Sequence, residues 1–180
     1  MNAVCRKAVV LVASWLVAGL AGCNLHPALE WTDVKQSIRT EFSGVRQLST
    51  RELFDWLADE SNPSPVLLDA RTADEFAVSH LRGAQLASDV VSAMGVLKSA
   101  DPDTSVVVYC SVGYRSSQLA EELTARGYSN VFNLEGSLFQ WANEGRPVYR
   151  GDVPVQAIHP YDAHWGRLLD SRFHPRGIVE

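Results

Sequence analysis

One cysteine stands where a reactive thiolate is expected. Cys110 directly follows the apolar run S-V-V-V-Y (105–109) and directly precedes a segment of helical character. A cysteine attacks as its thiolate, and a free thiol has a pKa of about 8.5, so a nucleophilic cysteine needs surroundings that favour the anion. Unpaired N–H groups at a helix N-terminus supply such surroundings. The position of Cys110 therefore predicts a nucleophile.

The residues after Cys110 support this interpretation. Gly113 lets the backbone curl so that successive N–H groups face one centre and form an anion nest. Arg115 adds a permanent positive charge, and Ser116 and Ser117 are placed to cap or line the start of the helix. The alternative is a buried structural cysteine, which is common. Such a cysteine does not require a glycine and an arginine within the next five positions.

The elements that must position this loop alternate between strand and helix. Short apolar runs predict strands at 66–68, 83–87, 105–109 and 131–133. Capping boxes predict helices after Ser49 and Thr72, and further helices are expected at 89–98, from the cysteine loop to Gly127, and at 137–143. This alternation indicates an α/β fold with a parallel sheet covered on both faces. Ligands bind such folds beyond the carboxyl ends of the strands, where Cys110 lies.

The loop and its flanks resemble the rhodanese family of sulfurtransferases over residues 45–150. The matching segments are V-L-L-D-A-R (66–71), D-E-F (74–76), S-H-L-R-G-A (79–84), V-V-Y-C-S-V-G-Y-R-S (107–116), G-Y-S-N-V (127–131), L-E-G (134–136), Trp141 and G-R-P-V (145–148). The resemblance implies a rhodanese-like fold, with a central parallel sheet and helices on both faces. Ser79, Leu81 and Ser137 depart from the family's residues. Because none of them is expected to touch the loop, only mild effects are predicted.

The resemblance also implies a mechanism. Cys110 would accept a sulfane sulfur as a persulfide and pass it to a thiol or cyanide-like acceptor. Arg115 would help to draw in an anionic donor such as thiosulfate. The loop residues that would hold the substrate sulfur are Ser111, Val112, Gly113, Tyr114 and Ser116. Asp69, Arg71 and Glu75 would support the site, with an ion pair from Arg71 to Glu75 or Asp74. No cofactor or metal is implied, because the cysteine itself carries the sulfur.

Two other functions remain open. Phosphatases of the cell-cycle type and arsenate reductases resemble this fold but carry one more loop residue, which suits a tetrahedral oxyanion. Cys110 and Arg115 are separated by four residues, and this shorter loop suits a single sulfur atom. The domain could also be a non-catalytic module that relays persulfide or binds a partner, and the sequence names no protein partner.

The first residues predict export and lipid attachment. Arg6 and Lys7 precede an uncharged stretch at 8–22, which as a helix would rise about 22 Å, short of a roughly 30 Å hydrocarbon core. Leu20-Ala21-Gly22-Cys23 resembles a bacterial lipobox. We therefore expect a lipoprotein signal peptide at 1–22, a lipid on Cys23 and a protein on the periplasmic face of the cell envelope. Asn24, by resemblance to proteobacterial lipoproteins, favours the outer membrane. The alternatives are an uncleaved anchor or an ordinary signal with a chance cysteine.

The remaining segments have simpler interpretations. Residues 23–44 are predicted to be a tether, 45–150 the domain, and 151–180 an aromatic C-terminal tail that packs over the domain or binds a partner or a membrane surface. The net charge is −5 without a basic run, which argues against nucleic-acid binding. Three isolated cysteines and the tail histidines lack metal-ligand spacing, so no metal site is predicted.

Overall fold

The computed structural model of this protein describes residues 29–175 of the 180-residue chain. The predicted signal peptide (1–22) and the predicted lipidation site Cys23 lie outside the described residues. Among residues 29–175, every helix is too short or too polar to cross a membrane.

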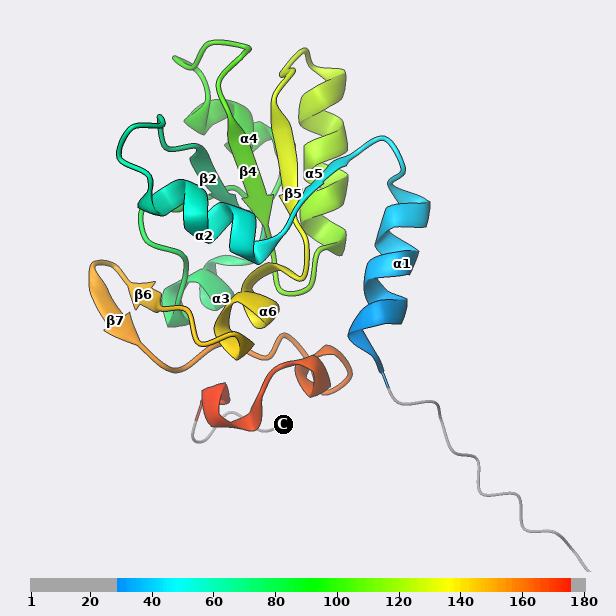
Figure 1. Ribbon diagram of the computed structural model, residues 1–180, viewed down its shortest axis with the longest axis vertical. Coiled ribbons are helices and arrows are strands. Elements are labelled where there is room, and N and C mark those ends of the chain that lie inside the picture. Colours follow the sequence, from blue (N-terminus) through cyan, green and yellow to red (C-terminus); the bar gives the residue numbers. More distant parts are fainter. Residues whose placement is uncertain (1–28, 176–180) are drawn as a thin grey trace, which may run out of the picture.

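A five-stranded parallel sheet forms the centre of the fold. Its strands are β1 (Arg46–Leu48), β2 (Val66–Asp69), β3 (Gln85–Leu86), β4 (Val106–Tyr109) and β5 (Val131–Leu134), in the order β1-β5-β4-β2-β3. All four residues of β4 are buried because it is the middle strand and is covered on both faces. The carboxyl end of β4 therefore lies between its neighbours β5 and β2 (Figure 1). Cys110 follows this strand directly in the chain.

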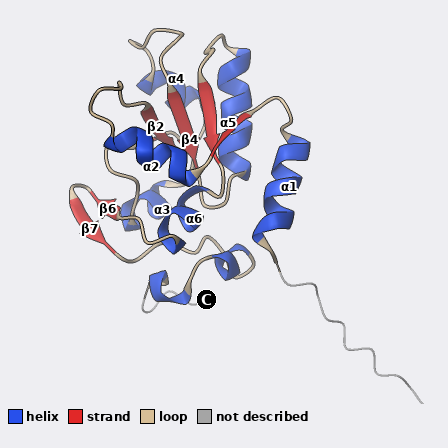
Figure 2. Ribbon diagram, in the orientation of Figure 1, coloured by secondary structure: helices blue, strands red, loops and turns tan. Residues whose placement is uncertain are grey.

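Helices cover both faces of this sheet, as the sequence predicted (Figure 2). The helices α4 (Val90–Val96) and α5 (Tyr114–Ala125) pack on one face, where they meet Val106 and Val108 of β4. The helices α1 (Trp31–Glu41), α2 (Thr50–Ala58) and α6 (Ser137–Asn143) contribute to the core on the other face, which contains Val107 and Tyr109. Alternate β4 side chains thus enter opposite halves of the core.

The helix α3 (Ala73–Val78) begins with the capping box that the sequence predicted. The Thr72 hydroxyl accepts from the Glu75 N–H, and the Glu75 carboxylate accepts from the Thr72 N–H. The box at Ser49 and Glu52 starts α2 in the same way. Both boxes satisfy backbone donors that a helix start leaves free. They differ in burial, since Glu75 is buried and Glu52 is exposed.

The helix α1 lies within residues 23–44, where the sequence had predicted only a tether. It packs on the domain through Val34 and Ile38, which lie four residues apart on one side and are both buried. Lys35 and Arg39 of the same helix form ion pairs with Glu135, which follows β5. Two core side chains in an otherwise polar segment give too weak a periodic signal for the helix to be predicted.

The chain beyond the sheet folds back over the domain. A hairpin of β6 (Val148–Arg150) and β7 (Val153–Val155) crosses the predicted domain boundary at residue 150. Two 3-10 turns follow, Trp165–Leu168 and Ser171–Phe173. Ile158, Leu168 and Leu169 are buried in the core on the α6 side. The tail residues that the structure describes therefore pack against the domain.

Candidate active site

The backbone around Cys110 is held by the start of α6. The N–H of Leu138 donates to the Cys110 carbonyl at 3.1 Å, and the N–H of Phe139 donates to the Ser111 carbonyl at 3.1 Å. The N–H of Cys110 in turn donates to Ser137 Oγ at 3.1 Å. Three hydrogen bonds therefore join the cysteine and its neighbour to a helix far from them in sequence.

Ser137 matters more than the sequence suggested. It has a positive φ of 48°, a conformation that favours glycine, and the family commonly has glycine there. The serine was predicted to have a mild effect because it was not expected to touch the loop, and that prediction is wrong. Ser137 Oγ accepts from the Cys110 N–H and donates to the Leu134 carbonyl at 3.0 Å. A glycine could make neither of these hydrogen bonds.

The sulfur of Cys110 meets polar hydrogens of the loop and of α5. The N–H of Gly113 donates to Cys110 Sγ at 3.1 Å, and the φ of Gly113 is +125°. Ser116 Oγ lies 3.4 Å from the same sulfur and 2.6 Å from Asn133 Oδ1. A hydroxyl has one proton, so Ser116 can donate to only one of these two atoms at a time. The loop thus directs a backbone donor at the sulfur itself and keeps a hydroxyl beside it.

Arg115 is tied to α3 by a bidentate ion pair. Its Nη1 and Nη2 lie 2.7 Å and 2.8 Å from the two carboxylate oxygens of Glu75. Ser111 Oγ joins this pair, since it donates to Glu75 at 3.0 Å and accepts from Arg115 at 3.0 Å. The guanidinium carbon also lies 4.6 Å from the centre of the Tyr161 ring. The network links both ends of the cysteine loop to one buried carboxylate.

Glu75 is held in its ionised form. Burial raises the pKa of this carboxyl, but the hydrogen bonds from Arg115 and from the Thr72 N–H, with the charges of Arg115 and Arg71, outweigh burial and lower the pKa to about 2. Glu75 in turn raises the pKa of Arg115. Glu75 was expected to support the site, and its geometry places it directly against the loop.

The sequence had predicted an ion pair from Arg71 to Glu75 or Asp74, and that prediction is wrong. Its guanidinium pairs with Asp69, with Nη2 2.7 Å from Oδ2 and Nε 2.9 Å from Oδ1, and both side chains are fully buried. The backbone N–H of Arg71 also donates to Asp69 Oδ1 at 3.0 Å. Asp69 therefore binds both the backbone and the side chain of the arginine two positions after it. Glu75 is left to Arg115, which reaches it from the first turn of α5.

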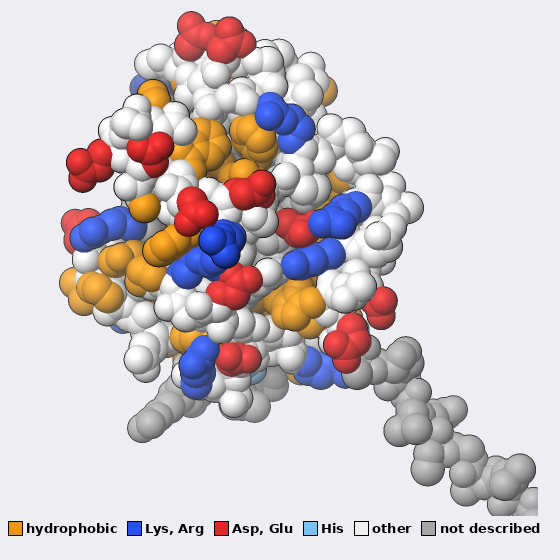
Figure 3. Space-filling model, in the orientation of Figure 1, with side chains coloured by type: hydrophobic (Ala, Val, Ile, Leu, Met, Phe, Trp, Pro, Cys, Tyr) orange, Lys and Arg blue, Asp and Glu red, His pale blue; other side chains and the backbone are white. Residues whose placement is uncertain are grey.

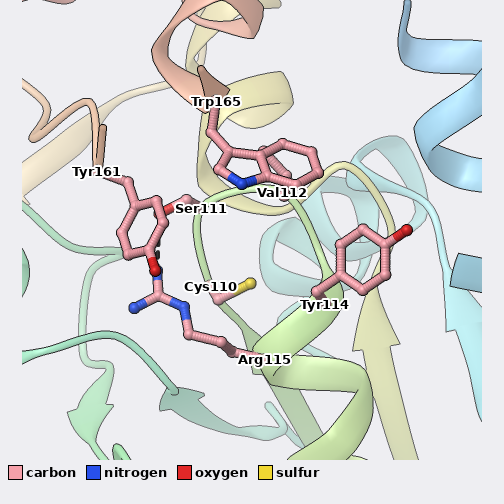
Figure 4. A pocket seen from close by; sticks show the side chains of 7 residues that line it. All are labelled: Cys110, Ser111, Val112, Tyr114, Arg115, Tyr161 and Trp165. Atoms are coloured by element: carbon pink, nitrogen blue, oxygen red, sulfur yellow. Dashed lines mark hydrogen bonds between the residues drawn. The ribbon is translucent and has the colours of Figure 1, made fainter. Parts of the chain in front are cut away.

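Seven residues line a pocket of about 100 Å³ over the cysteine. They are Cys110, Ser111, Val112, Tyr114, Arg115, Tyr161 and Trp165. Figure 4 shows Cys110 at the centre of the group, with Tyr161 and Trp165 entering from the tail. The sequence singled out the tail as aromatic but could not assign these two side chains to the site, since which aromatic residues face the loop depends on how the tail packs.

Among residues 29–175, no cluster of three or more histidine, cysteine or acidic side chains is arranged to hold a metal ion. Basic and acidic side chains are interspersed over the face of the molecule in Figure 3. The groups that the structure does place at this site are the Cys110 thiol, the Gly113 N–H and the Arg115 guanidinium paired with Glu75.

The chain was compared with known proteins. The family model described as "Rhodanese-like domain" matches residues 53–144. A protein named "Sulfurtransferase" from Allochromatium vinosum is 32% identical over 105 residues, which are 58% of this chain and 94% of that protein. "Probable adenylyltransferase/sulfurtransferase MoeZ" of Mycobacterium tuberculosis is 31% identical over 56% of this chain, and the match spans only 25% of that longer protein.

Solved structures agree on the fold. The crystal structure of a thiosulfate sulfurtransferase from Pseudomonas aeruginosa superposes with a TM-score of 0.56 at 23% identity, over 73% of this chain and 25% of that one. The rhodanese-like domain of the Anabaena protein Alr3790 gives a TM-score of 0.52 at 23% identity, over 59% and 80% of the two chains. With a family model that covers half of the sequence, a central parallel sheet and a cysteine loop in the expected place, this chain belongs to the rhodanese-like domain family.

Proposed function

We propose that this chain is a sulfurtransferase that carries a sulfane sulfur on Cys110. The observation that carries the proposal is the Gly113 N–H, which points at Cys110 Sγ from 3.1 Å within a loop of four residues between Cys110 and Arg115. The loop thus places one backbone donor, and the Ser116 hydroxyl at 3.4 Å, beside this sulfur atom. Two relatives whose names contain "sulfurtransferase" also support the proposal, with 32% and 34% sequence identity over 105 and 88 residues.

The reaction has two displacements. In the first, the Cys110 thiolate attacks the outer sulfur of a donor, a new S–S bond forms, and the donor's bond to that sulfur breaks with its electron pair on the leaving group. In the second, a thiolate or cyanide attacks the outer sulfur of the persulfide, and the Cys110 thiolate leaves with the electron pair of the S–S bond. The enzyme is thereby restored, so neither an external oxidant nor a cofactor takes part.

The loop's own groups supply the stabilisation. The persulfide that forms on Cys110 carries negative charge, and the N–H groups of the loop from Ser111 to Arg115 are the donors for it. Ser116 Oγ lies between Asn133 Oδ1 at 2.6 Å and Cys110 Sγ at 3.4 Å, so its single proton can be directed to either atom. Once the sulfur is ionised, the same hydroxyl can turn and donate to it.

The loop supports sulfur chemistry over oxyanion chemistry. Four residues separate Cys110 from Arg115, one fewer than in the phosphatases and arsenate reductases that the fold resembles, and the shorter loop suits a single sulfur atom. A persulfide adds one atom in line with the Cys110 side chain. A screen of the full chain against an aryl phosphate and against arsenate tests this distinction, and we expect no turnover with either.

Turnover separates an enzyme from a passive persulfide relay. We expect the full chain to produce thiocyanate from cyanide and a sulfane sulfur donor over many cycles, and Cys110→Ser to produce none. The control is the free energy of unfolding of Cys110→Ser, which should match that of the native chain because the two side chains are similar in size. A single stoichiometric release without further cycles would instead support the relay.

We also propose that Cys23 carries a lipid that holds the domain at the periplasmic face of the cell envelope. The support is the lipobox-like L-A-G-C at 20–23 after an uncharged stretch with basic residues before it. Cys23→Ser should move the protein from the membrane to the soluble fraction when the chain is expressed in a bacterium. Cys5→Ser is the matched control and should stay with the membrane, as should the native chain. A Cys23→Ser protein that stays membrane-bound would contradict the proposal.

A further inference from the structure

A buried asparagine lies beneath the cysteine loop. Asn133 is a residue of β5 and is fully buried. Its partners across the sheet are Val108 of β4 and Gln47 of β1, and a Cβ at position 113 would lie 3.5 Å from its Nδ2. A buried amide costs free energy unless its polar atoms are hydrogen-bonded. The partners of Asn133 therefore indicate what this side chain does.

Both polar atoms of the Asn133 amide are hydrogen-bonded. Its Oδ1 accepts from Ser116 Oγ at 2.6 Å, and its Nδ2 donates to Gln47 Oε1 at 2.7 Å. Gln47 Nε2 in turn donates to the Val45 carbonyl at 3.4 Å. Because a carbonyl oxygen can only accept, the chain of donors runs in one direction, toward this backbone carbonyl. The amide of Asn133 is thereby oriented with its oxygen toward Ser116.

The acceptor on Asn133 decides where the Ser116 hydroxyl lies. Ser116 is in the first turn of α5, and a serine in a helix can instead turn its hydroxyl to a carbonyl oxygen of the preceding turn. Here the hydroxyl is bonded to Asn133 and lies 3.4 Å from Cys110 Sγ. A hydrogen bond to an ionised group is stronger than one to a neutral amide, so a rotation of the O–H bond directs the proton to the sulfur when the thiolate forms.

We propose that Asn133 is a positioning residue, which holds the Ser116 hydroxyl beside Cys110 so that the thiolate gains a hydrogen-bond donor. The inference rests on the proposed function, because it concerns the two displacements at Cys110. The cysteine is a thiolate when it attacks the sulfur donor, and it is a thiolate again when it leaves the persulfide. The hydroxyl donates a hydrogen bond and transfers no proton, so it changes neither the bonds that form nor those that break.

A double-mutant cycle tests whether Asn133 acts through Ser116. The protein is loaded with sulfur on Cys110, and the loss of that sulfur to cyanide is timed by intact mass spectrometry. Ser116→Ala and Asn133→Ala should each slow this step about ten- to hundredfold, the range for a lost hydrogen bond to a charged group. The double variant should be at most about twofold slower than Ser116→Ala, because the hydroxyl that Asn133 holds is already gone. Losses that multiply, or a native rate in Asn133→Ala, overturn the inference.

Asn130→Ala is the matched control for a lost asparagine. Asn130 directly precedes β5 and lies at the opposite end of this strand, and its Nδ2 also donates to a serine hydroxyl, that of Ser105. Urea unfolding should show that Asn130→Ala lowers the stability of the protein, whereas its rate of sulfur transfer to cyanide should stay native. Equal slowing by Asn130→Ala and Asn133→Ala overturns the inference, because any destabilisation of the sheet would then slow the reaction.

Gln47→Ala tests the same chain of hydrogen bonds if Asn133→Ala does not fold. Gln47 is only partly buried, and its loss frees the Asn133 amide to turn over. Gln47→Ala should slow the transfer several-fold in the native background and have no effect together with Ser116→Ala. Equal slowing in both backgrounds, or none in either, overturns the inference. A native protein that gains no sulfur on Cys110 from thiosulfate or benzenethiosulfonate would instead overturn the proposed function, and the inference with it.

Discussion

Glu75→Gln separates the ion pair from the capping box that share one side chain. Glutamine is accepted at the third position of a capping box, so the variant keeps the α3 start but removes the charge that Arg115 and Ser111 contact. The pKa of Glu75 falls from 4.5 to about 2 in the folded protein, which corresponds to about 3 kcal/mol, since a pKa difference of one corresponds to about 1.4 kcal/mol. The Arg115 side chain is 31% exposed, so water weakens the pair and we expect a loss of about 2 kcal/mol.

The sign of the pH dependence follows from the direction of the shift. A carboxyl whose pKa is lowered by folding stabilises the native state fully above its unfolded pKa of 4.5, and this contribution is lost as the pH falls toward about 2. The difference in the free energy of unfolding between the native chain and Glu75→Gln should therefore be constant from pH 7 to pH 5. It should shrink steadily below pH 4.5, because the unfolded native chain takes up the proton first.

Urea unfolding followed by tryptophan fluorescence measures both effects. Glu52→Gln is the matched control, because Glu52 holds the same capping-box position in α2, is exposed and has no arginine partner among the described residues. Its cost should stay below about 0.5 kcal/mol. The reasoning is refuted if Glu75→Gln costs no more than Glu52→Gln, or if its deficit at pH 3 equals its deficit at pH 7.

Two further substitutions test the loop and the tail. Gly113→Ala should destabilise the protein by about 1–3 kcal/mol and slow sulfur transfer. The reason is that the φ of +125° disfavours a side chain and that the new Cβ would lie 3.0 Å from Ile38 Cδ1. A variant with native stability and a native rate of sulfur transfer would contradict the loop geometry. Ile158→Ala should lower the free energy of unfolding by about 2–5 kcal/mol, because Ile158 is fully buried between the tail and the domain. A loss below 1 kcal/mol in chemical unfolding would mean that the tail does not belong to the core.

The sheet and the cysteine loop were predictable because each has a local signal. The run of buried β-branched residues in β4 is too apolar for any but a central strand. The two capping boxes set the starts of α2 and α3 to the residue. Cys110, Gly113 and Arg115 lie within six positions, so their proximity is fixed by the chain itself.

The parts that the sequence could not predict depend on contacts between distant residues. Arg115 lies forty positions from Glu75, so no local pattern shows that Glu75 pairs with Arg115. The nearer arginine, Arg71, pairs with Asp69 instead. Ser137 reaches Cys110 only because α6 packs against the loop. Tyr161 reaches the pocket only because the buried Ile158 and Leu168 anchor the tail on either side of it. These side chains act through tertiary packing, which a single sequence does not reveal.

The central claim is that Cys110 carries sulfur, and peptide mass mapping tests it directly. The protein, purified in detergent, is treated with thiosulfate and with benzenethiosulfonate and digested, and the peptide that contains Cys110 is weighed. The account predicts a gain of one sulfur atom on the peptide that contains Cys110, lost again when cyanide or a thiol is added, and no gain in Cys110→Ser. A Cys110 peptide of unchanged mass with both donors would contradict it.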